Sequence, residues 1–279
     1  MRKSFLILFI SLIYLSTTCD NDSNVIGPSL DQFIYPIKIG NEWNYKKILF
    51  FSNVRLTVDN YPIIEDTSIS SIIIKVTNEK QLHDSINTYI FNSTLYQNGS
   101  LFTDESYYVN QKDGLYFYGY NNTNPGINVP KIKATKKIYF NGYYFHNIKE
   151  LEDLLIKATS LYQFSTDTII YENPPLLVLK YPLEINDVWT YRNPNQSYQI
   201  SKKIIGVKNI VVPAGKFKCF KIQWLLDINK DEKWDNNILF YDYICDKGLI
   251  RRTICFKNLW FFSNSWQQCP YLVGLKKRV

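Results

Sequence analysis

A short motif that occurs twice constrains the fold of this chain more than any other feature. The first copy runs from Tyr35 to Tyr45 as YPIKIGNEWNY, and the second runs from Tyr181 to Tyr191 as YPLEINDVWTY. In each copy Pro, followed by Gly or by Asn-Asp, favours a turn, and Trp and Tyr two positions apart fall on one face of the strand that follows. A repeated unit of this kind predicts a fold built from two related halves that begin near residues 35 and 181.

Shorter motifs recur in the same order after each copy. Tyr107-Tyr108 precedes Asp113-Gly114-Leu115 in the first half, and Phe240-Tyr241 precedes Lys247-Gly248-Leu249 in the second. The intervening sequence consists of short runs rich in Ile, Val, Tyr and Phe that are separated by Asn, Asp, Gly and Pro, a pattern typical of strands and turns. The strands predicted in this way are 70–76, 88–91, 106–109, 115–120, 176–179, 199–212, 216–226, 238–244 and 249–256.

One segment has the pattern of a helix instead. Asn147 can cap it, Glu150 stands three residues later, and apolar residues up to Ala158 keep a period of 3.6 residues. The predicted fold is therefore mainly β: a curved antiparallel sheet or half-barrel built from two related halves, with one covering helix. We expect a single β-rich domain over residues 35–279.

The motifs together resemble those of a large group of uncharacterised bacterial lipoproteins. They are the two YP motifs, VPAGKFKC from Val212 to Cys219, and DKGLIRR from Asp246 to Arg252. Members of that group carry similar YPLKVGNxWxY and VPAGTF sequences in the same order. The resemblance implies an extracytoplasmic antiparallel sheet and assigns no catalytic residue. The second copy departs from the group in having Asn186-Asp187 where Gly-Asp is common.

The amino-terminal residues have the layout of a secretory signal peptide, predicted over residues 1–18. Arg2 and Lys3 are followed by an apolar run from Phe5 to Leu15 and by small residues before Cys19. A cysteine in this place resembles the lipobox of bacterial lipoproteins, although Ser16 stands where the usual pattern has Leu. We expect Cys19 to carry palmitate-type acyl chains that anchor the protein to a membrane. Residues 19–34 then form a flexible tether.

The overall charge gives little sign of a nucleic-acid partner. The formal charge is +7, and loss of Arg2 and Lys3 with the signal leaves 30 basic against 25 acidic residues, a net charge of +5. The basic residues are scattered or lie at the carboxyl end, so no nucleic-acid surface is indicated.

Four further cysteines lie in the last quarter of the chain: Cys219, Cys245, Cys255 and Cys269. In an exported chain an even set indicates disulfides, and three pairings are open. The strands 216–226 and 237–245 are expected to be antiparallel partners, which favours Cys219 with Cys245 and Cys255 with Cys269. Their spacing does not match a zinc ribbon.

No local motif of catalysis is present. The chain has two histidines, His83 and His146, which we interpret as surface or capping residues, and it lacks a nucleophile elbow, a phosphate loop and a dinucleotide fingerprint. A glycosidase remains an alternative, because its two carboxylates can come from distant strands without a local signature.

Two further segments are candidate binding sites. Asp227, Asn229, Asp231 and Asp235 occupy positions 1, 3, 5 and 9 of a calcium-loop pattern, but Glu232 replaces the turn Gly and Ile238 replaces the last acid. A polar hairpin tip is the other interpretation of this loop. Tyr116, Tyr118 and Tyr120 could stack on sugar rings, or could pair across strands as in any sheet.

These observations together predict a non-enzymatic, lipid-anchored protein of the bacterial cell envelope, on the periplasmic or cell-surface side of the outer membrane. It is expected to need no cofactor, apart from the calcium hypothesis, and to bind or scaffold an unknown ligand or envelope protein. The alternative is a surface protein that binds or cleaves glycans.

Overall fold

The computed structural model describes residues 33–54, 64–82, 85–97, 99–122, 137–140, 143–146, 150, 169–193, 198–262 and 270–278. These residues form long antiparallel strands, and every strand predicted from the sequence lies within an observed one. The mainly β, antiparallel fold is thus confirmed. The strands are β1 Glu42–Val54, β2 Ile64–Leu82, β3 Ile86–Gln97, β4 Ser100–Gln111, β5 Gly114–Asn122, β6 Lys137–Phe140, β7 Tyr143–Phe145, β8 Ile170–Lys180, β9 Val188–Arg192, β10 Gln199–Val212, β11 Gly215–Asp227, β12 Ile238–Cys245, β13 Gly248–Phe262 and β14 Pro270–Arg278.

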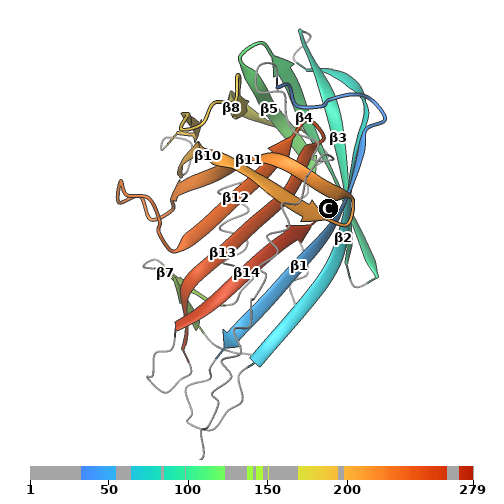
Figure 1. Cartoon of the computed structure of the whole chain (residues 1–279). Helices are drawn as coiled ribbons and strands as arrows, with labels where there is room; N and C mark the ends of the chain where they lie inside the picture. The colour runs from blue at the N-terminus through green and yellow to red at the C-terminus, as the bar shows by residue number, and fades with distance from the viewer. Residues whose placement is uncertain are drawn as a thin grey trace, which may run out of the picture.

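The strand order divides the sheet into two equivalent runs. The order is β8-β5-β4-β3-β2-β1-β14-β13-β12-β11-β10-β9, with β6 and β7 attached beside β13. Each run is a five-stranded meander, β1 to β5 or β9 to β13, followed by a return strand, β8 or β14, that pairs with the fifth strand. The pairing of β1 with β14 joins the two runs into one continuous sheet (Figure 1).

The two copies of the YP motif form the same turn before the first strand of each run. Asn41 N donates to Lys38 O at 3.0 Å, and at the equivalent place Asp187 N donates to Glu184 O at 3.1 Å. Gly40 and Asn186 hold the same position and both have a left-handed backbone, with φ of 92° and 75°. Asn tolerates this conformation better than other non-glycine residues, which explains why it can replace Gly in the second copy.

Each of these turns is fastened to the neighbouring strand by the same pair of backbone hydrogen bonds. In the first copy Gly40 N donates to Val76 O at 2.8 Å and Val76 N donates to Asn41 O at 2.9 Å. In the second copy the matching bonds join residues 186 and 187 to Ile204, at 2.8 and 3.0 Å. Val76 and Ile204 are both fully buried. The repeated sequence therefore specifies a repeated local structure.

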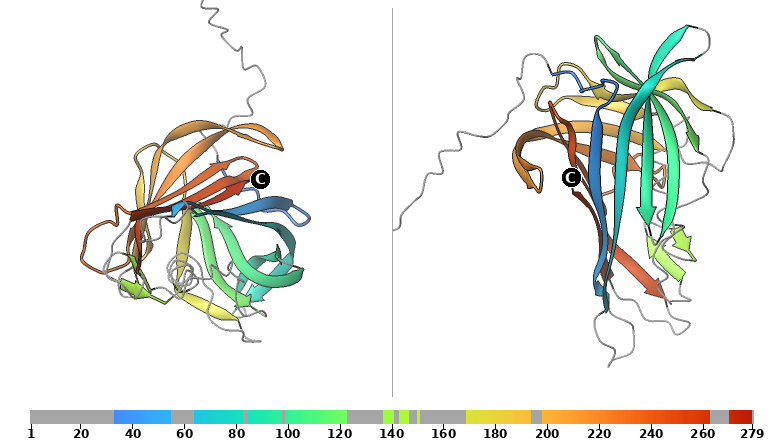
Figure 2. Two further views of the ribbon diagram at one scale, coloured as in Figure 1. Left: turned by 90° about the horizontal axis from the view of Figure 1, so that it is seen from below. Right: turned by 90° about the vertical axis from the view of Figure 1, so that its right-hand side faces the viewer.

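The strands curl around a shared interior (Figure 2), and two hydrophobic clusters fill their inner face. The first, which we name the Trp224 cluster, contains Phe117, Tyr120, Phe140, Phe145, Leu176, Tyr191, Ile200, Trp224, Leu226, Ile228, Ile238, Phe240 and Phe256. The second, the Phe220 cluster, contains Phe33, Leu115, Leu179, Tyr181, Leu183, Trp189, Ile204, Phe220, Ile222 and Ile244.

The amino-terminal segment packs against residues far along the chain. Phe33 is buried, and its ring lies 6.0 Å from that of Tyr181 and 6.1 Å from that of Phe220. Tyr35 N donates to the Tyr181 hydroxyl at 2.9 Å, that hydroxyl donates to Asn110 Oδ1 at 2.8 Å, and Asn110 Nδ2 donates back to Tyr35 O at 2.8 Å. Tyr35 and Tyr181, the first residues of the two YP motifs, are thus hydrogen-bonded to each other and to Asn110. Phe33 belongs to the packed core, although the sequence predicted a tether there.

The tip of the β10–β11 hairpin curls over the outer face of β12 and β13 (Figure 2). The turn at Pro213 and Ala214 has the tight form predicted from VPAG, with Val212 paired to Gly215. Arg251 Nη2 fastens this tip by donating to Val211 O at 2.7 Å. Beneath the tip lies a third buried cluster, the Cys219 cluster, made of Ile210, Val212, Phe217, Cys219, Cys245 and Ile250.

The covering helix predicted from Asn147 to Ala158 is not supported. Apart from residue 150, the whole segment lies outside the described residues, and the elements that the structure does describe are all strands. Glu150 Oε2 accepts a hydrogen bond from His146 N at 2.7 Å, one residue before the predicted cap. Among the described residues, no helix has the length and apolar character needed to cross a membrane.

Candidate functional site

The inner face carries a cluster of charged side chains, which we name the Lys202 cluster: Lys202 on β10, Asp242 on β12 and Arg252 on β13, together with Trp224 on β11. Strand register brings them together, because Lys202 lies opposite Trp224 and Asp242 lies opposite Arg252. Directly opposed residues on antiparallel strands point to the same face with close Cβ atoms. Four successive strands therefore each contribute one member.

Asp242 and Arg252 form a bidentate ion pair. Arg252 Nε and Nη2 donate to the two carboxylate oxygens of Asp242 at 2.6 and 2.8 Å, and Trp224 Nε1 donates to Asp242 Oδ2 at 2.9 Å. Burial by itself would raise the pKa of Asp242, but the Arg252 charge and these hydrogen bonds outweigh it and hold the pKa below its ordinary value. For Arg252, burial acts to lower the pKa and the Asp242 carboxylate raises it more strongly. Both groups therefore stay charged at neutral pH.

Lys202 is a buried cation in an aromatic environment. Only 1% of its surface is exposed, and its Nζ lies 3.8 Å from the ring centre of Trp224 and 4.3 Å from that of Tyr191. Nζ donates to Val178 O on β8 at 2.9 Å. Burial lowers the pKa of Lys202 to about 7, although the Asp242 carboxylate acts in the opposite direction. The protonation of the Lys202 amine is therefore sensitive to pH near neutrality.

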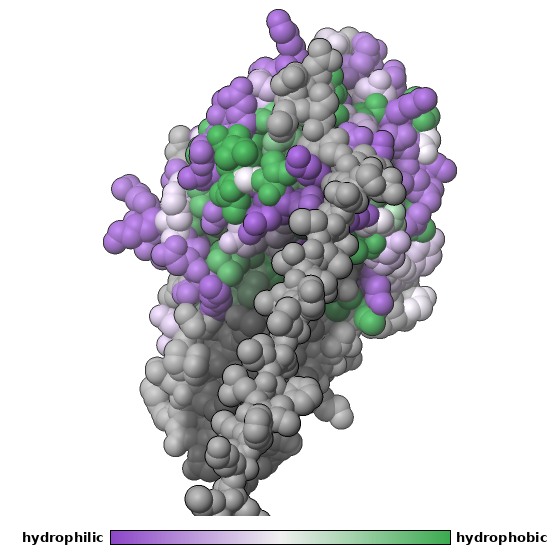
Figure 3. All heavy atoms as spheres, in the orientation of Figure 1, coloured by the Kyte–Doolittle hydropathy of each residue, from purple (hydrophilic) through white to green (hydrophobic). Residues whose placement is uncertain are grey.

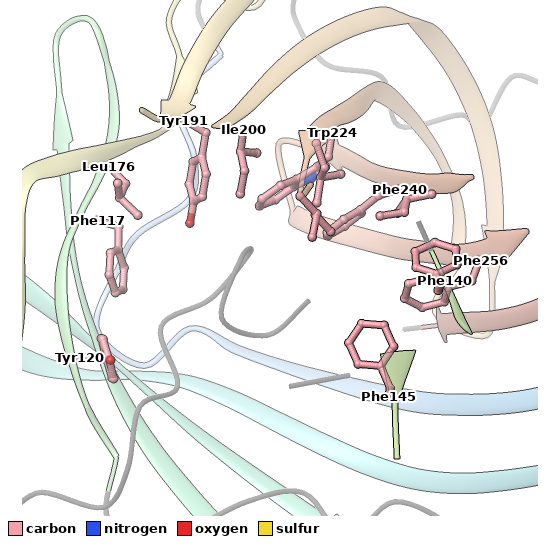
Figure 4. Close-up of a cluster of buried hydrophobic side chains, with 13 residues drawn as sticks. Phe117, Tyr120, Phe140, Phe145, Leu176, Tyr191, Ile200, Trp224, Phe240 and Phe256 are labelled. Atoms are coloured by element: carbon pink, nitrogen blue, oxygen red, sulfur yellow. The ribbon is translucent and has the colours of Figure 1, made fainter. Parts of the chain in front are cut away.

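The Lys202 cluster lies between the two apolar clusters of the inner face. Along β10, Lys202 stands between Ile200 of the Trp224 cluster and Ile204 of the Phe220 cluster, and along β12 Asp242 stands between Phe240 and Ile244 in the same way. Figure 4 shows Tyr191, Ile200, Trp224 and Phe240 projecting into this interior. The rings of Trp224 and Phe240 stack with centres 4.4 Å apart and an interplanar angle of 5°.

The bonding of these groups limits the chemistry that they can perform. The Asp242 carboxylate accepts three hydrogen bonds and is held ionised, which does not suit a general acid. Arg252 keeps 30% of its side-chain surface exposed, but its fork is occupied by Asp242. A second buried ion pair joins Arg192 Nη2 on β9 to Glu172 Oε1 on β8 at 2.9 Å, and these two strands lie at opposite ends of the strand order. Among the described residues, Arg192 Nε has no hydrogen-bond partner. The Asp242–Arg252 pair does join neighbouring strands, and it favours one register over others.

The Lys202 cluster was not predicted from the sequence, although a signal for it is readable. The run ILFYDYIC places Asp242 at an alternate position between Phe240 and Ile244, on the face that carries large apolar side chains. A charged residue on the apolar face of a strand needs a partner, because an unpaired buried charge is costly. The sequence does not reveal which strand supplies that partner.

The predicted calcium residues lie in the turn between β11 and β12, and their oxygens mostly bind the backbone. Asp227 is buried and accepts from the amides of Asp231 and Glu232 at 3.2 and 3.0 Å, and Asp235 accepts from the amide of Ile228 at 2.8 Å. Asn229 Nδ2 donates to Asp231 Oδ2 at 3.0 Å. In the described part of the chain, no three His, Cys, Asp or Glu side chains are arranged to hold a metal ion. Calcium binding stays a prediction.

The three candidate tyrosines on β5 do not share one exposed face. Tyr120 is buried in the Trp224 cluster, because a bulge between Phe117 and Gly119 changes the alternation of the strand. Tyr116 and Tyr118 are half-buried. The Tyr116 hydroxyl donates to Asp113 Oδ2 at 2.8 Å, and the Tyr118 hydroxyl accepts from Gln111 Nε2 at 3.0 Å. Sugar binding at Tyr116 and Tyr118 remains a hypothesis.

The structure describes some of the cysteines and histidines and not others. Cys19, Cys269 and His83 lie outside the described residues. Cys219, Cys245 and Cys255 are free thiols in this structure, so the predicted disulfides are not seen. The predicted pairing of the strands 216–226 and 237–245 is confirmed, since β11 and β12 are antiparallel with Phe220 opposite Ile244. His146 is exposed, and its Nδ1 lies 3.1 Å from Glu150 Oε2.

Comparison with known proteins identifies no family for this chain. No family model and no curated protein sequence matches the chain. One similar solved structure is a protein inferred to be exported, with a YmcC-like fold, from Bacteroides fragilis: it is 12% identical, the match covers 87% of this chain and 97% of that one, and the TM-score is 0.30. Another is an inferred lipoprotein from Parabacteroides distasonis, 14% identical over 88% of this chain and 99% of that one, with a TM-score of 0.31. At such scores the likeness supports no conclusion about this chain.

Proposed function

We propose that this chain is a lipid-anchored protein of the bacterial cell envelope whose sheet is a non-enzymatic binding or scaffolding domain. The observation that carries the proposal is the placement of Cys19 directly after a signal-like sequence and a short distance before Phe33, the first described residue, which is buried. Acyl chains on that cysteine would hold the sheet at a membrane surface.

The length of the linking segment sets how far the sheet can stand from its anchor. Residues 20–32 separate Cys19 from Phe33, and a fully extended chain between these two residues spans at most about 50 Å. Phe33 is fixed against Tyr181 and Phe220 in the Phe220 cluster. The proposed anchor therefore keeps that end of the sheet within about one domain diameter of the membrane.

Metabolic labelling tests the anchor. Cells that express the full chain are fed a fatty acid with an alkyne tag, and incorporation is compared between the native protein and Cys19→Ser. We expect label in the native protein and none in the variant, with both present in the envelope fraction by antibody. Cys255→Ser is the matched control and should label like the native protein. Equal label in native protein and Cys19→Ser, or no label in either, would contradict the proposal.

The bonding of the inner face supports a binding or scaffolding role rather than catalysis. Asp242 is hydrogen-bonded to Arg252 and to Trp224. Lys202 donates to the carbonyl oxygen of Val178 on β8. A thermal-shift screen of the purified chain against small molecules and envelope extracts tests this role. A ligand that raises the melting temperature and is recovered unchanged supports it. Conversion of such a ligand to product would show an enzyme instead.

A glycan-related role is the second candidate, favoured by the ordered rings of Tyr116 and Tyr118. The Tyr116 hydroxyl is hydrogen-bonded to Asp113 and the Tyr118 hydroxyl to Gln111, so each ring is held in one orientation. The two tyrosines stand two positions apart on β5. A glycan array probed with the native chain and with the double variant Tyr116→Ala, Tyr118→Ala separates the two functions. Binding that the double variant loses supports the glycan role, and binding that it keeps, or no binding by the native chain, removes it.

A further inference from the structure

We infer that Cys219 and Cys245 form a disulfide that fastens the end of β11 to the end of β12 in the mature protein. Both side chains are fully buried in the Cys219 cluster, on the outer face of the sheet. The last residues paired between the two strands are Phe220 and Ile244, so the next position in the same register sets Cys219 opposite Cys245. This inference rests on the proposed function, because export places the chain where disulfides persist.

The register satisfies the geometry that a disulfide needs. Directly opposed residues on antiparallel strands have Cα atoms about 4.5 to 5.5 Å apart. A disulfide requires a Cα separation of about 4.4 to 6.8 Å. The Cys219 thiol donates to Phe217 O at 3.7 Å, and both sulfurs lie in the Cys219 cluster.

The structure also decides among the three pairings that the sequence left open. Cys245 pairs in register with Gly248, and Cys255 lies further along the same strand, β13. At about 3.3 Å per residue, Gly248 and Cys255 are about 23 Å apart. A bond from Cys255 to Cys245 or to Cys219 would therefore need a large movement of the sheet. The geometry leaves Cys219 with Cys245.

The oxidant that the reaction needs is a protein disulfide carried by a thiol oxidoreductase of the exported compartment. The Cys245 thiolate attacks one sulfur of that disulfide, which forms a mixed disulfide and releases the other sulfur as a thiolate. Deprotonated Cys219 then attacks the Cys245 sulfur, so the bond to the carrier breaks and the Cys219–Cys245 bond forms. Two electrons and two protons pass to the carrier, which leaves as a dithiol. Because both sulfurs are buried in the finished fold, the exchange takes place while the strands assemble.

Peptide mapping of the envelope protein tests the inference. Cells are quenched in acid, free thiols are blocked with N-ethylmaleimide under denaturing conditions, and the digest is analysed by mass spectrometry with and without reduction. We expect a linked peptide pair that contains Cys219 and Cys245, lacks two hydrogen atoms relative to the dithiol, and disappears on reduction. In Cys245→Ser, Cys219 should instead carry the maleimide.

The outcomes separate this inference from the proposed function. Maleimide on both Cys219 and Cys245, in protein that carries the fatty-acid label at Cys19, overturns the disulfide and leaves the anchor intact. A linked pair in protein without that label keeps the disulfide and overturns the anchor. As a second measurement, a thiol reductant should lower the melting temperature of the native protein more than that of Cys219→Ala, Cys245→Ala, in which only the predicted Cys255–Cys269 pair can respond. Equal melting with and without reductant in the native protein would also contradict the inference.

Discussion

The buried ammonium of Lys202 should make the stability of the protein depend on pH in a defined window. Its pKa falls from 10.5 to about 7 on folding. At about 1.4 kcal/mol for each pKa unit, burying the charged form costs the folded state about 5 kcal/mol below pH 7. Because the folded pKa is the lower one, the unfolded chain binds the proton more tightly between pH 7 and 10, and stability rises with pH across that range.

The size of the effect follows from the two pKa values. Between pH 6.5 and pH 9 the contribution of Lys202 amounts to a gain of about 2.5 kcal/mol in the free energy of unfolding. The range ends at pH 9 because Tyr35, Tyr108 and Tyr191 have raised pKa values from burial. Those tyrosines ionise first in the unfolded chain, which would lower stability above about pH 10.

The substitution Lys202→Met isolates this contribution. It removes the buried charge and also the hydrogen bond to Val178, which is worth about 1 kcal/mol. The cation–π contacts already enter the pKa of the charged form and are absent from the neutral amine at pH 9, so they are not counted again. We therefore expect the variant to be more stable than the native protein by about 3.5 kcal/mol at pH 6.5 and by about 1 kcal/mol at pH 9. Urea denaturation at both pH values measures the difference, with Lys208→Met, an exposed lysine on the same strand, as the control. A native stability that does not change between these pH values, or the same slope in Lys202→Met, would refute the reasoning.

Three further predictions concern the turns and the ion pair. Gly248→Ala and Gly40→Ala share a φ near 92°, but a Cβ at residue 248 would meet Trp43 Nε1 at 2.9 Å whereas residue 40 is open. Urea denaturation should therefore show a cost of about 1 kcal/mol for Gly40→Ala and about 2 to 4 kcal/mol for Gly248→Ala, and equal costs would exclude the Trp43 contact as the cause. Asp242→Asn should lower the free energy of unfolding by about 3 to 5 kcal/mol, because it leaves Arg252 buried without its charged partner. The double variant Asp242→Leu, Arg252→Leu should lower it much less, and equal losses would contradict this reason. Burial, helped by the charges of Asp227 and Asp231, raises the pKa of Asp235 to about 6, so its ionisation removes stability as pH rises from about 4 to 6. Asp235→Asn should raise the melting temperature more at pH 7 than at pH 4, and a larger gain at pH 4 would contradict this sign.

The sequence predicted the local structure of the sheet well because local residues determine it. Pro182 and Asn186 favour the second YP turn through their own backbone preferences, and the VPAG run favours the β10–β11 hairpin in the same way. The strands β6, β7 and β14 were not predicted. β6 and β7 have only four and three residues, too few for a clear alternation.

The candidate site could not be predicted, because it depends on which strands are neighbours. Lys202, Trp224 and Asp242 come from three strands, and only their registers show that they meet. The same limit explains why the sequence did not show that Tyr120 lies apart from Tyr116 and Tyr118. Alternation placed Tyr116, Tyr118 and Tyr120 on one face, but the bulge at residues 117–119 moves Tyr120 to the core. The bulge interrupts the pairing of β5 with both of its neighbours, β4 and β8, and the alternation of residue types does not reveal it.

The pairing of β1 with β14 has a consequence for how the molecule assembles. The last described strand, β14, is not an edge strand, since it lies at the centre of the strand order and joins the second run to β1 of the first. A chain that emerges amino end first cannot complete the middle of the sheet until β14 has been made, and contacts between such distant segments make folding slow. Until then the first run presents β1 as an unpaired edge, which is a site for mispairing with another copy. Loss of β14 would thus divide the sheet in two rather than narrow it.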